Sequence, residues 1–242
     1  MAYIKEHYDK ILSEYYSWVF GGLENNIKDN IEFFLSSGLI PRQGGIALDL
    51  GAGSGFQSIP LGQLGYKIIS IDFSEELLAE IKQNSNGLQI TTINDDILNF
   101  KKYVTNNVEL CVCMGDTLTH LTSLEDVKKL LSDVFDVLEK QGTFVLSFRD
   151  LTKQLTGLDR IIPVRSEKDK IFTCFLEYEK DKVKVTDILY QYKNKEWQIK
   201  KSYYRKIKIS KEWIITQMED IGYLIVQSSV DNGMVKIIAK KE

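Results

Sequence analysis

The sequence predicts an α/β protein built around a doubly wound, mostly parallel sheet. Short apolar runs typical of buried strands alternate with amphipathic segments typical of helices, and the connections between them are short. This alternation over residues 44–148 indicates a parallel sheet covered by helices on both faces. Such sheets bind ligands at the carboxyl ends of their strands, near the point where the strand order reverses. A functional site is therefore expected at that edge.

The elements of this sheet follow from local patterns. Helices are expected at 56–64, 74–84 and 123–140, with Ser74 as an N-cap and Ser123 opening a capping pattern. Pro60 lies inside the first of these helices, and the pattern does not explain it, because proline removes one helical hydrogen bond. Apolar runs predict five strands, at residues 44–50, 66–72, 88–94, 108–114 and 142–148.

The remaining segments have other spacings of apolar residues. Residues 3–37 have helical spacing that Gly21-Gly22 divides into two helices, and 171–210 predicts an antiparallel meander. A helix at 211–223 and a hairpin turning at Asp231–Gly233 close the chain, since Asn-Gly favours such a turn. We expect an N-terminal helical cap (1–40), a core (41–150 and 211–242) and an inserted antiparallel sheet on the substrate side (151–210).

Composition narrows the class of protein. The 242 residues are 43% hydrophobic and 27% charged, which is ordinary for a globular chain. No apolar run approaches the roughly 20 residues that span a bilayer, and the N-terminus lacks the apolar core of a secretory signal. Three cysteines do not make a disulfide framework, so a cytoplasmic protein is expected. Residues 1–150 carry a net charge of −9 and residues 151–242 one of +6, which suits an anionic partner for the second part.

A glycine-rich loop follows the first strand, in the sequence Asp49-Leu50-Gly51-Ala52-Gly53-Ser54-Gly55. Glycines let the backbone turn sharply and approach a ligand closely. Their spacing fails the Gly-x-Gly-x-x-Gly pattern, which disfavours a nicotinamide oxidoreductase, and no Gly-Lys-Ser/Thr of a P-loop follows. Asp49 would repel a pyrophosphate but attract a cationic ligand, such as a zwitterionic nucleoside.

Acidic residues also end the next two strands. Asp72 can accept hydrogen bonds from both hydroxyls of a ribose, and Phe73 can lie against an adenine ring. At the third strand end, the carboxylate of Asp96 can accept from an exocyclic amine, and a backbone N–H can donate to a ring nitrogen. One of Asp95 and Asp96 is expected only to cap a turn.

Taken together, these motifs resemble the class I S-adenosylmethionine-dependent methyltransferases over residues 40–150 and 211–242. The resemblance implies a Rossmann-like, seven-stranded sheet with a C-terminal antiparallel hairpin. It also implies that S-adenosyl-L-methionine is the cofactor and S-adenosyl-L-homocysteine the product. The residues it assigns to the cofactor are Asp49, Gly51, Ala52, Gly53 and Gly55 of the loop, Asp72 with Phe73 at the ribose and adenine, Asp96 with Ile97 at the adenine, and Met114.

The segment after the fourth strand, Met114 to Leu121, is similar to that of small-molecule methyltransferases of the glycine N-methyltransferase type. In that type the segment faces the methyl group and the substrate. The resemblance implies methyl transfer to a small-molecule acceptor by in-line displacement, where alignment and exclusion of water supply much of the acceleration. A base is needed only if the acceptor must lose a proton.

Several residues are candidates for orienting or deprotonating the acceptor. His120, Asp116 and Arg149 are the catalytic candidates, although His120 also fits a helix cap and Arg149 a salt bridge. Tyr15, Tyr16, Thr117 and Arg149 are assigned to the substrate pocket; core packing is the rival role of the tyrosines. His7 is expected at the surface. No metal site is expected, since Cys111 and Cys113 lack further ligands nearby.

A basic, aromatic stretch at 193–211 favours a second reading, an RNA or protein methyltransferase. Strand alternation argues against it, because it groups Trp197, Ile199 and Tyr203 on one face that we expect to be half-buried. Pro-Pro and Pro-Cys motifs are also absent. A non-catalytic S-adenosylmethionine-binding protein is a further alternative. The expected partner is a small molecule, without nucleic acid or membrane, for a monomer or homodimer.

Overall fold

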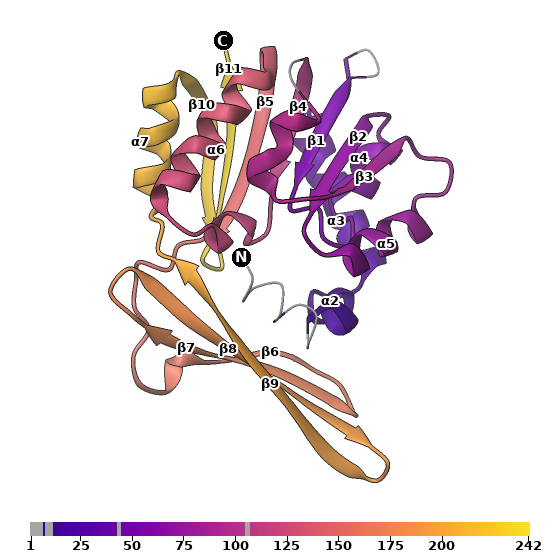
Figure 1. Cartoon of the computed structure of the whole chain (residues 1–242), viewed down its shortest axis with the longest axis vertical. Coiled ribbons are helices and arrows are strands. Elements are labelled where there is room, and N and C mark those ends of the chain that lie inside the picture. Colours follow the sequence, from indigo (N-terminus) through magenta and orange to yellow (C-terminus); the bar gives the residue numbers. More distant parts are fainter. Residues whose placement is uncertain (1–6, 8–11, 43–44, 105–106) are drawn as a thin grey trace.

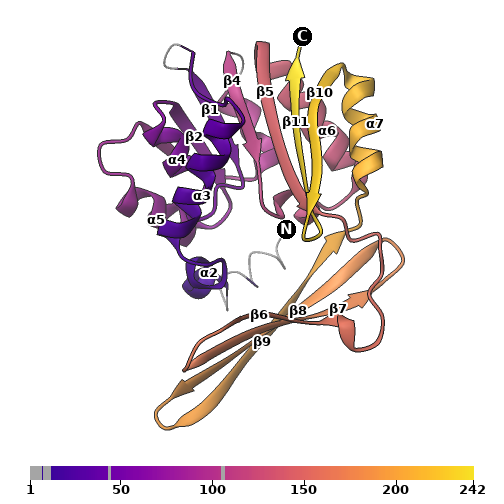
Figure 2. The same cartoon turned by 180° about the vertical axis from the view of Figure 1, so that it is seen from behind.

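Two β-sheets organise the chain in the computed structural model, which describes residues 7, 12–42, 45–104 and 107–242. A seven-stranded sheet has the order β10-β11-β5-β4-β1-β2-β3, and a four-stranded sheet has the order β6-β7-β8-β9. Figures 1 and 2 show the smaller sheet lying across one end of the larger one. The predicted doubly wound α/β fold with an added antiparallel sheet is confirmed. Its division into cap, core and insert stays a prediction.

The larger sheet contains the five predicted strands and the closing hairpin. Strands β1 to β5 run parallel, while β11 runs antiparallel to both β5 and β10. Strand β5 begins four residues earlier than expected. The seven strands are β1 (Ile46–Leu50), β2 (Lys67–Asp72), β3 (Ile90–Asn94), β4 (Val108–Cys113), β5 (Leu138–Arg149), β10 (Tyr223–Asp231) and β11 (Met234–Lys241).

Helices cover both faces of this sheet. One face packs against α6 and α7 in the largest apolar cluster, and the opposite face packs against α3 and α4. The α-helices are α2 (Ser13–Val19), α3 (Leu23–Ser36), α4 (Ser58–Gln63), α5 (Glu75–Asn84), α6 (Leu124–Val137) and α7 (Lys211–Ile221). The described residues also form short 3₁₀ helices, namely η2 (Ile97–Lys102), η3 (Thr117–His120) and η4 (Gly157–Arg160).

Local signals set the helix starts as expected. The Ser74 hydroxyl accepts from the Leu77 N–H at 3.4 Å and so caps α5, while the Ser123 hydroxyl accepts from the Asp126 N–H at 3.1 Å and so caps α6. These bonds satisfy backbone donors that a helix start otherwise leaves without partners. No described helix is long and apolar enough to cross a membrane.

Pro60 is accommodated by a side chain from another helix. It lies in the first turn of α4, where it lacks the N–H that would donate to the Phe56 carbonyl. Asn30 of α3 donates its Nδ2–H to that carbonyl at 3.0 Å instead. This contact ties α3 to the start of α4, directly after the glycine loop.

The second sheet contains β6, which the sequence analysis missed, and three predicted strands. All neighbouring pairs are antiparallel. Its strands are β6 (Ile161–Ser166), β7 (Lys170–Tyr178), β8 (Lys182–Lys193) and β9 (Glu196–Ile207).

The expected burial of one face of β9 was wrong. Trp197, Ile199 and Tyr203 are 49%, 60% and 47% exposed. The register explains the difference, because Tyr204 and Lys206 lie opposite Val185 and Val183 and share their buried face. In a strand, neighbouring residues point to opposite faces, so Trp197, Ile199 and Tyr203 point outward. Ile207, at the end of β9, is buried as expected, with 4% of its surface exposed.

Replacing Asn30 by Ala should lower the free energy of unfolding by about 1–2 kcal/mol, because a buried carbonyl loses its donor. The cost should shrink when Pro60 is also replaced by Ala, since residue 60 then supplies an N–H to Phe56. Urea unfolding of the four proteins of this cycle measures the coupling. Asn25→Ala is a matched control, because the Asn25 side chain bonds only to the carbonyl of Gly21. An equal cost in both backgrounds would contradict this account.

Candidate functional site

The glycine loop lies at the reversal point of the strand order. Strand β1 pairs with β2 on one side and β4 on the other, so the loops after β1 and β4 leave the sheet side by side. The N–H groups of Gly51 and Ala52 both donate to the carbonyl of Ile71 at 2.8 and 3.1 Å, which turns the chain back across β2. This is the edge at which α/β sheets bind ligands.

All three loop glycines are required by their surroundings; Gly55 has φ +88°, and a Cβ there would lie 2.9 Å from the Ile81 side chain. Gly51 has φ +78°, and a Cβ there would lie 2.3 Å from the Thr117 side chain. Gly53 has φ +50°, and a Cβ there would approach the Tyr16 hydroxyl at 3.3 Å. All three positions need a left-handed backbone that glycine adopts without strain. The loop thus forms a backbone cradle that side chains would fill.

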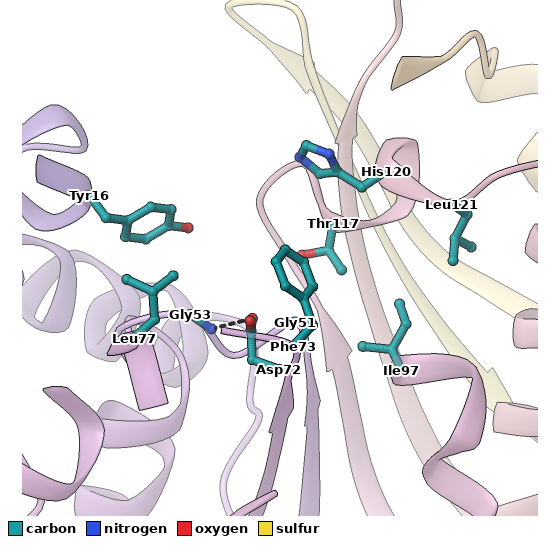
Figure 3. Close-up of a pocket in the computed structure, with 10 residues that line it drawn as sticks. All are labelled: Tyr16, Gly51, Gly53, Asp72, Phe73, Leu77, Ile97, Thr117, His120 and Leu121. Carbon is teal, nitrogen blue, oxygen red and sulfur yellow. Dashed lines mark hydrogen bonds between the residues drawn. The ribbon is translucent and has the colours of Figure 1, made fainter. Parts of the chain in front are cut away.

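Asp72 holds the cradle in place. Its Oδ2 accepts from the Gly53 N–H at 2.9 Å (Figure 3). Its Oδ1 accepts from the Ser74 N–H at 2.8 Å. Burial raises the pKa of this carboxyl, and the backbone donors partly oppose that rise. Asp72 is 6% exposed and lines the pocket, so its carboxylate is positioned for a ligand at the loop.

A pocket opens over this cradle (Figure 3). Eight sequence-predicted residues line it, together with Leu77 and Leu121, which the sequence analysis did not single out. The eight are Tyr16, Gly51, Gly53, Asp72, Phe73, Ile97, Thr117 and His120. Other predicted residues lie outside its lining, namely Asp49, Ala52, Gly55, Asp96, Met114, Tyr15, Asp116 and Arg149.

Asp49 lies behind the loop. Its Oδ2 accepts from the Ser58 hydroxyl at 2.6 Å, and the Ser58 and Ser70 hydroxyls are 2.7 Å apart. Within the described residues its Oδ1 has no hydrogen-bond partner. Burial raises the pKa of Asp49 to about 7, although the bond from Ser58 opposes the rise. This arrangement connects the end of β1 to α4 and β2.

The acidic pair after β3 serves the local backbone. Asp96 accepts from the Leu98 N–H at 2.9 Å and caps η2, and Asp95 accepts from the Asp96 N–H at 2.7 Å and from Asn99 at 2.8 Å. Both carboxylates therefore make turn contacts, where only one of the two was expected to. Ile97 is the residue of this segment that reaches the pocket.

The two neighbouring tyrosines of α2, Tyr15 and Tyr16, point to different parts of the molecule. The Tyr16 ring lies at the pocket, stacked on Phe56 with ring centroids 5.5 Å apart. The Tyr15 hydroxyl instead donates to Gln191 of β8 at 3.0 Å. Helix α2 thus joins the pocket to the smaller sheet.

An ion pair joins the smaller sheet to the residue before η3, whose Thr117 and His120 form one wall of the pocket. Lys206 of β9 donates to Asp116 Oδ2 at 2.6 Å, and the Arg149 N–H donates to Asp116 Oδ1 at 2.8 Å. Burial alone would raise the pKa of Asp116, but Lys206 and Arg149 lower it overall. Asp116 precedes η3, so this contact positions Thr117 and His120. The Arg149 side chain is 51% exposed and forms a salt bridge with Asp116.

His120 sits at the inner end of this wall. Burial lowers its pKa to about 3, and the nearby positive charge of Lys206 adds to that effect. Its ring is 5.2 Å from that of Tyr204, which is in turn 4.5 Å from His7. His120 is therefore a neutral imidazole at physiological pH.

His7 was expected at the surface, and this expectation was wrong. It is fully buried, and its Nε2 lies 3.0 Å from Oδ2 of Asp187, whose Oδ1 accepts from the Cys174 thiol at 2.8 Å. The sequence carried a signal for Asp187, because it interrupts the apolar alternation of Val183, Val185 and Leu189 in β8. Within the described residues, no three His, Cys, Asp or Glu side chains are grouped to hold a metal ion.

The family model for a methyltransferase domain matches residues 47–142, which contain the loop, Asp72, Ile97 and η3. Residues 47–142 thus match a methyltransferase domain, and the expected resemblance to class I S-adenosylmethionine-dependent methyltransferases is confirmed. A glycine/sarcosine N-methyltransferase from Aphanothece halophytica is 30% identical over 105 residues, which cover 43% of this chain and 40% of that protein. The match to this curated relative thus spans about two fifths of its length.

Solved structures share the fold of this methyltransferase domain together with the smaller sheet. An S-adenosylmethionine-dependent methyltransferase from Clostridium acetobutylicum matches with TM-score 0.72 and 18% identity, over 98% of this chain and 97% of the other. An S-adenosylmethionine-bound amino pentose methyltransferase from Micromonospora echinaspora matches with TM-score 0.74 and 12% identity, over 95% and 96%. At these identities the likeness shows the fold alone.

Gly51→Ala should destabilise the methyltransferase domain more than Gly115→Ala does, by about 1–3 kcal/mol. Both glycines have positive φ, but a Cβ at Gly115 would have no atom within 4 Å, while one at Gly51 would collide with Thr117. Because both variants carry the backbone strain of a positive φ, the difference between their free energies of unfolding reports the collision with Thr117. Urea unfolding measures both free energies. Equal losses would show that the loop does not approach η3 as described.

Asp49→Asn should gain stability over the wild type as pH rises. A carboxyl whose folded pKa is raised to about 7 stabilises the fold below its unfolded pKa, and loses that contribution as pH rises through 7. The variant's relative gain should grow by about 1–4 kcal/mol between pH 4 and pH 8. Asp95→Asn is the control with the opposite trend, since hydrogen bonds from Asn99 and Tyr103 lower the pKa of Asp95 to about 2. Parallel pH curves for wild type and Asp49→Asn would disprove the burial argument.

Proposed function

We propose that this chain transfers the methyl group of S-adenosylmethionine to an amine of a small molecule, releasing S-adenosylhomocysteine. The observation that carries the proposal is the pocket itself. It runs from the glycine cradle and Asp72 on one side of the reversal point to Thr117 and His120 on the other. A cofactor side and an acceptor side therefore share one cavity.

The residues present fit an adenosyl sulfonium. Gly51 and Gly53 line the pocket with backbone alone, and Asp72 offers a buried carboxylate beside them. We assign the backbone of the loop to the amino-acid part, Asp72 to the ribose hydroxyls, and Phe73 with Ile97 to the adenine. When bound, the cofactor would supply a methyl group activated by a positively charged sulfur.

The acceptor side suits an amine. An amine must be neutral to act as a nucleophile. With its pKa lowered to about 3, His120 stays neutral and can accept a hydrogen bond from an amine N–H, which orients the amine without removing its proton. Asp116, held by Lys206 and by the backbone of Arg149, has a positioning role, because it fixes η3 and with it His120. Tyr16 and Phe73 enclose the pocket with aromatic rings, which limits the access of water.

The names of the similar proteins agree with a small acceptor. The Aphanothece relative is named for glycine and sarcosine, and the Micromonospora structure for an amino pentose. Both names describe primary or secondary amines on small polar molecules. We therefore propose an amino acid or amino sugar as the acceptor class of this chain.

Labelled-methyl transfer tests this function. The wild type should transfer label from S-adenosylmethionine to glycine, sarcosine or an amino sugar, and Asp72→Asn should weaken binding of S-adenosylhomocysteine by about 1–3 kcal/mol in calorimetry, since a charged acceptor becomes a neutral amide. Asp95→Asn is the matched control, because Asp95 ends the next strand without lining the pocket. Label found only in RNA or protein fractions of a cell extract would overturn the small-molecule proposal. Cofactor binding without transfer to any fraction would overturn the catalytic one.

A further inference from the structure

A second cavity lies at the edge of the seven-stranded sheet opposite to the glycine loop. It is bounded by residues 37–42, which follow α3, and by β4, β5, β10 and β11. Tyr66 precedes β2 and Glu109 lies at the start of β4, so the cavity is at the amino ends of the parallel strands. We call it the amino-end cavity. No described residue lines both this cavity and the pocket over the glycine loop.

Helices cover this face of the sheet only in part, which leaves the cavity beside α3. Helix α3 ends at Ser36, and the chain then turns at Gly38, which has φ +68°. Figure 2 shows α3 and α4 over β1 and β2, and no described helix in front of β10 and β11. The apolar residues that line the cavity are Leu39, Ile40, Leu110, Val226 and Ile238.

Polar side chains also line the amino-end cavity, and protein groups do not satisfy them. Tyr66 and Thr143 are 3% and 7% exposed, and neither hydroxyl forms a hydrogen bond within the described residues. Buried hydroxyls normally have a partner, so these two point to a bound molecule. The side chains of Gln141, Gln227 and Lys240 add further donors, and in the described part of the chain they too have no hydrogen bond or ion pair.

The charges around the cavity are separated by sign. Glu109 is 8% exposed, and its Oε1 accepts from the Arg42 backbone N–H at 2.8 Å and lies 3.4 Å from Nε of that residue. Arg42 also pairs with Glu139, so this group of three carries one net negative charge. Lys240 supplies a positive charge from β11. Because β5 lies between β4 and β11, the two charged groups come from strands about 10 Å apart.

This arrangement favours a zwitterion over a simple ion. A lone carboxylate would be repelled by the glutamates, and a lone amine by Lys240. The cavity has a volume of about 330 Å³, at the low end of the range for small-molecule sites. At about 30 Å³ for each water-sized group, it holds about ten non-hydrogen atoms. That size fits an amino acid and is too small for a nucleotide.

We propose that the amino-end cavity binds a free α-amino acid with an apolar side chain. Lys240 and the Thr143 hydroxyl bind its carboxylate, since the register places these two residues opposite each other on β11 and β5. Glu109 and the Tyr66 hydroxyl bind its ammonium group, and the apolar lining residues contact its side chain. Occupancy of this site does not depend on the proposed methyl transfer.

Titration calorimetry of the full chain with L-leucine up to about 20 mM tests this site. The wild type should show saturable binding at one site. Lys240→Met should weaken that binding at least tenfold, since the carboxylate loses a charge-assisted hydrogen bond. Lys236→Met is the matched control, because Lys236 lies on the same face of β11 and does not line the cavity. It should leave the affinity unchanged.

Two analogues separate the zwitterion from its parts. The first, 4-methylpentanoate, keeps the carboxylate and the branched chain of L-leucine, and the second, 3-methylbutylamine, keeps the ammonium group and the same chain. Each should bind at least tenfold more weakly than L-leucine, because each leaves one charged group of the cavity without its partner. Asp72→Asn should leave L-leucine binding unchanged, since Asp72 lines the other pocket.

The proposal is overturned by a wild type without saturable binding, by either analogue binding as tightly as L-leucine, or by an equal loss in Lys236→Met. Weaker binding by Asp72→Asn would also overturn it, because L-leucine would then occupy the pocket over the glycine loop. If Lys240→Met does not fold, Val226→Trp replaces it. Val226 lines the cavity from β10 and is 55% exposed, so the larger ring should fill the cavity and abolish binding. Retained affinity in that variant would contradict the proposed site.

Discussion

The close passage of Gly51 beside Thr117 is the constraint on which the site depends. The loop after β1 and the 3₁₀ helix after β4 diverge from the sheet at the same point, and they meet with no room for a Cβ between them. Glycines without side chains form one side of the pocket, and Thr117 and His120 of η3 form the other. Asp72 fixes the loop from below, and Asp116 fixes the wall from the side.

Much of the larger sheet could be predicted because its determinants are local. Ser74 and Ser123 cap their helices as their spacing indicates, and the buried strands follow from uninterrupted apolar runs. The phase of β9 could not be predicted in this way, since both of its faces carry apolar residues, and only the pairing with β8 decides which one is buried. Pro60 was likewise unexplained because its compensation comes from Asn30, thirty residues earlier.

The residues in and around the pocket also fall into two groups, those whose place follows from local sequence and those brought there by tertiary contacts. The residues found from sequence are those that directly follow a strand, such as Gly51, Asp72 and Ile97. Lys206, Asp187 and His7 were missed because they come from the smaller sheet and the N-terminus, and no spacing along the chain announces that they meet. His7 pairs with Asp187 and Lys206 pairs with Asp116, and such pairing makes charged and polar groups tolerable in an interior.

The hydrogen bond from the Asn30 side chain to the Phe56 carbonyl makes the start of α4 depend on α3. A helix that begins at a ligand loop usually contains its own first turn, whereas here the turn is finished by a side chain borrowed from α3. Helix α3 is therefore a structural part of the segment that follows the glycine loop. A shortened chain that lacked α3 would leave the Phe56 carbonyl without this donor, directly after the glycine loop.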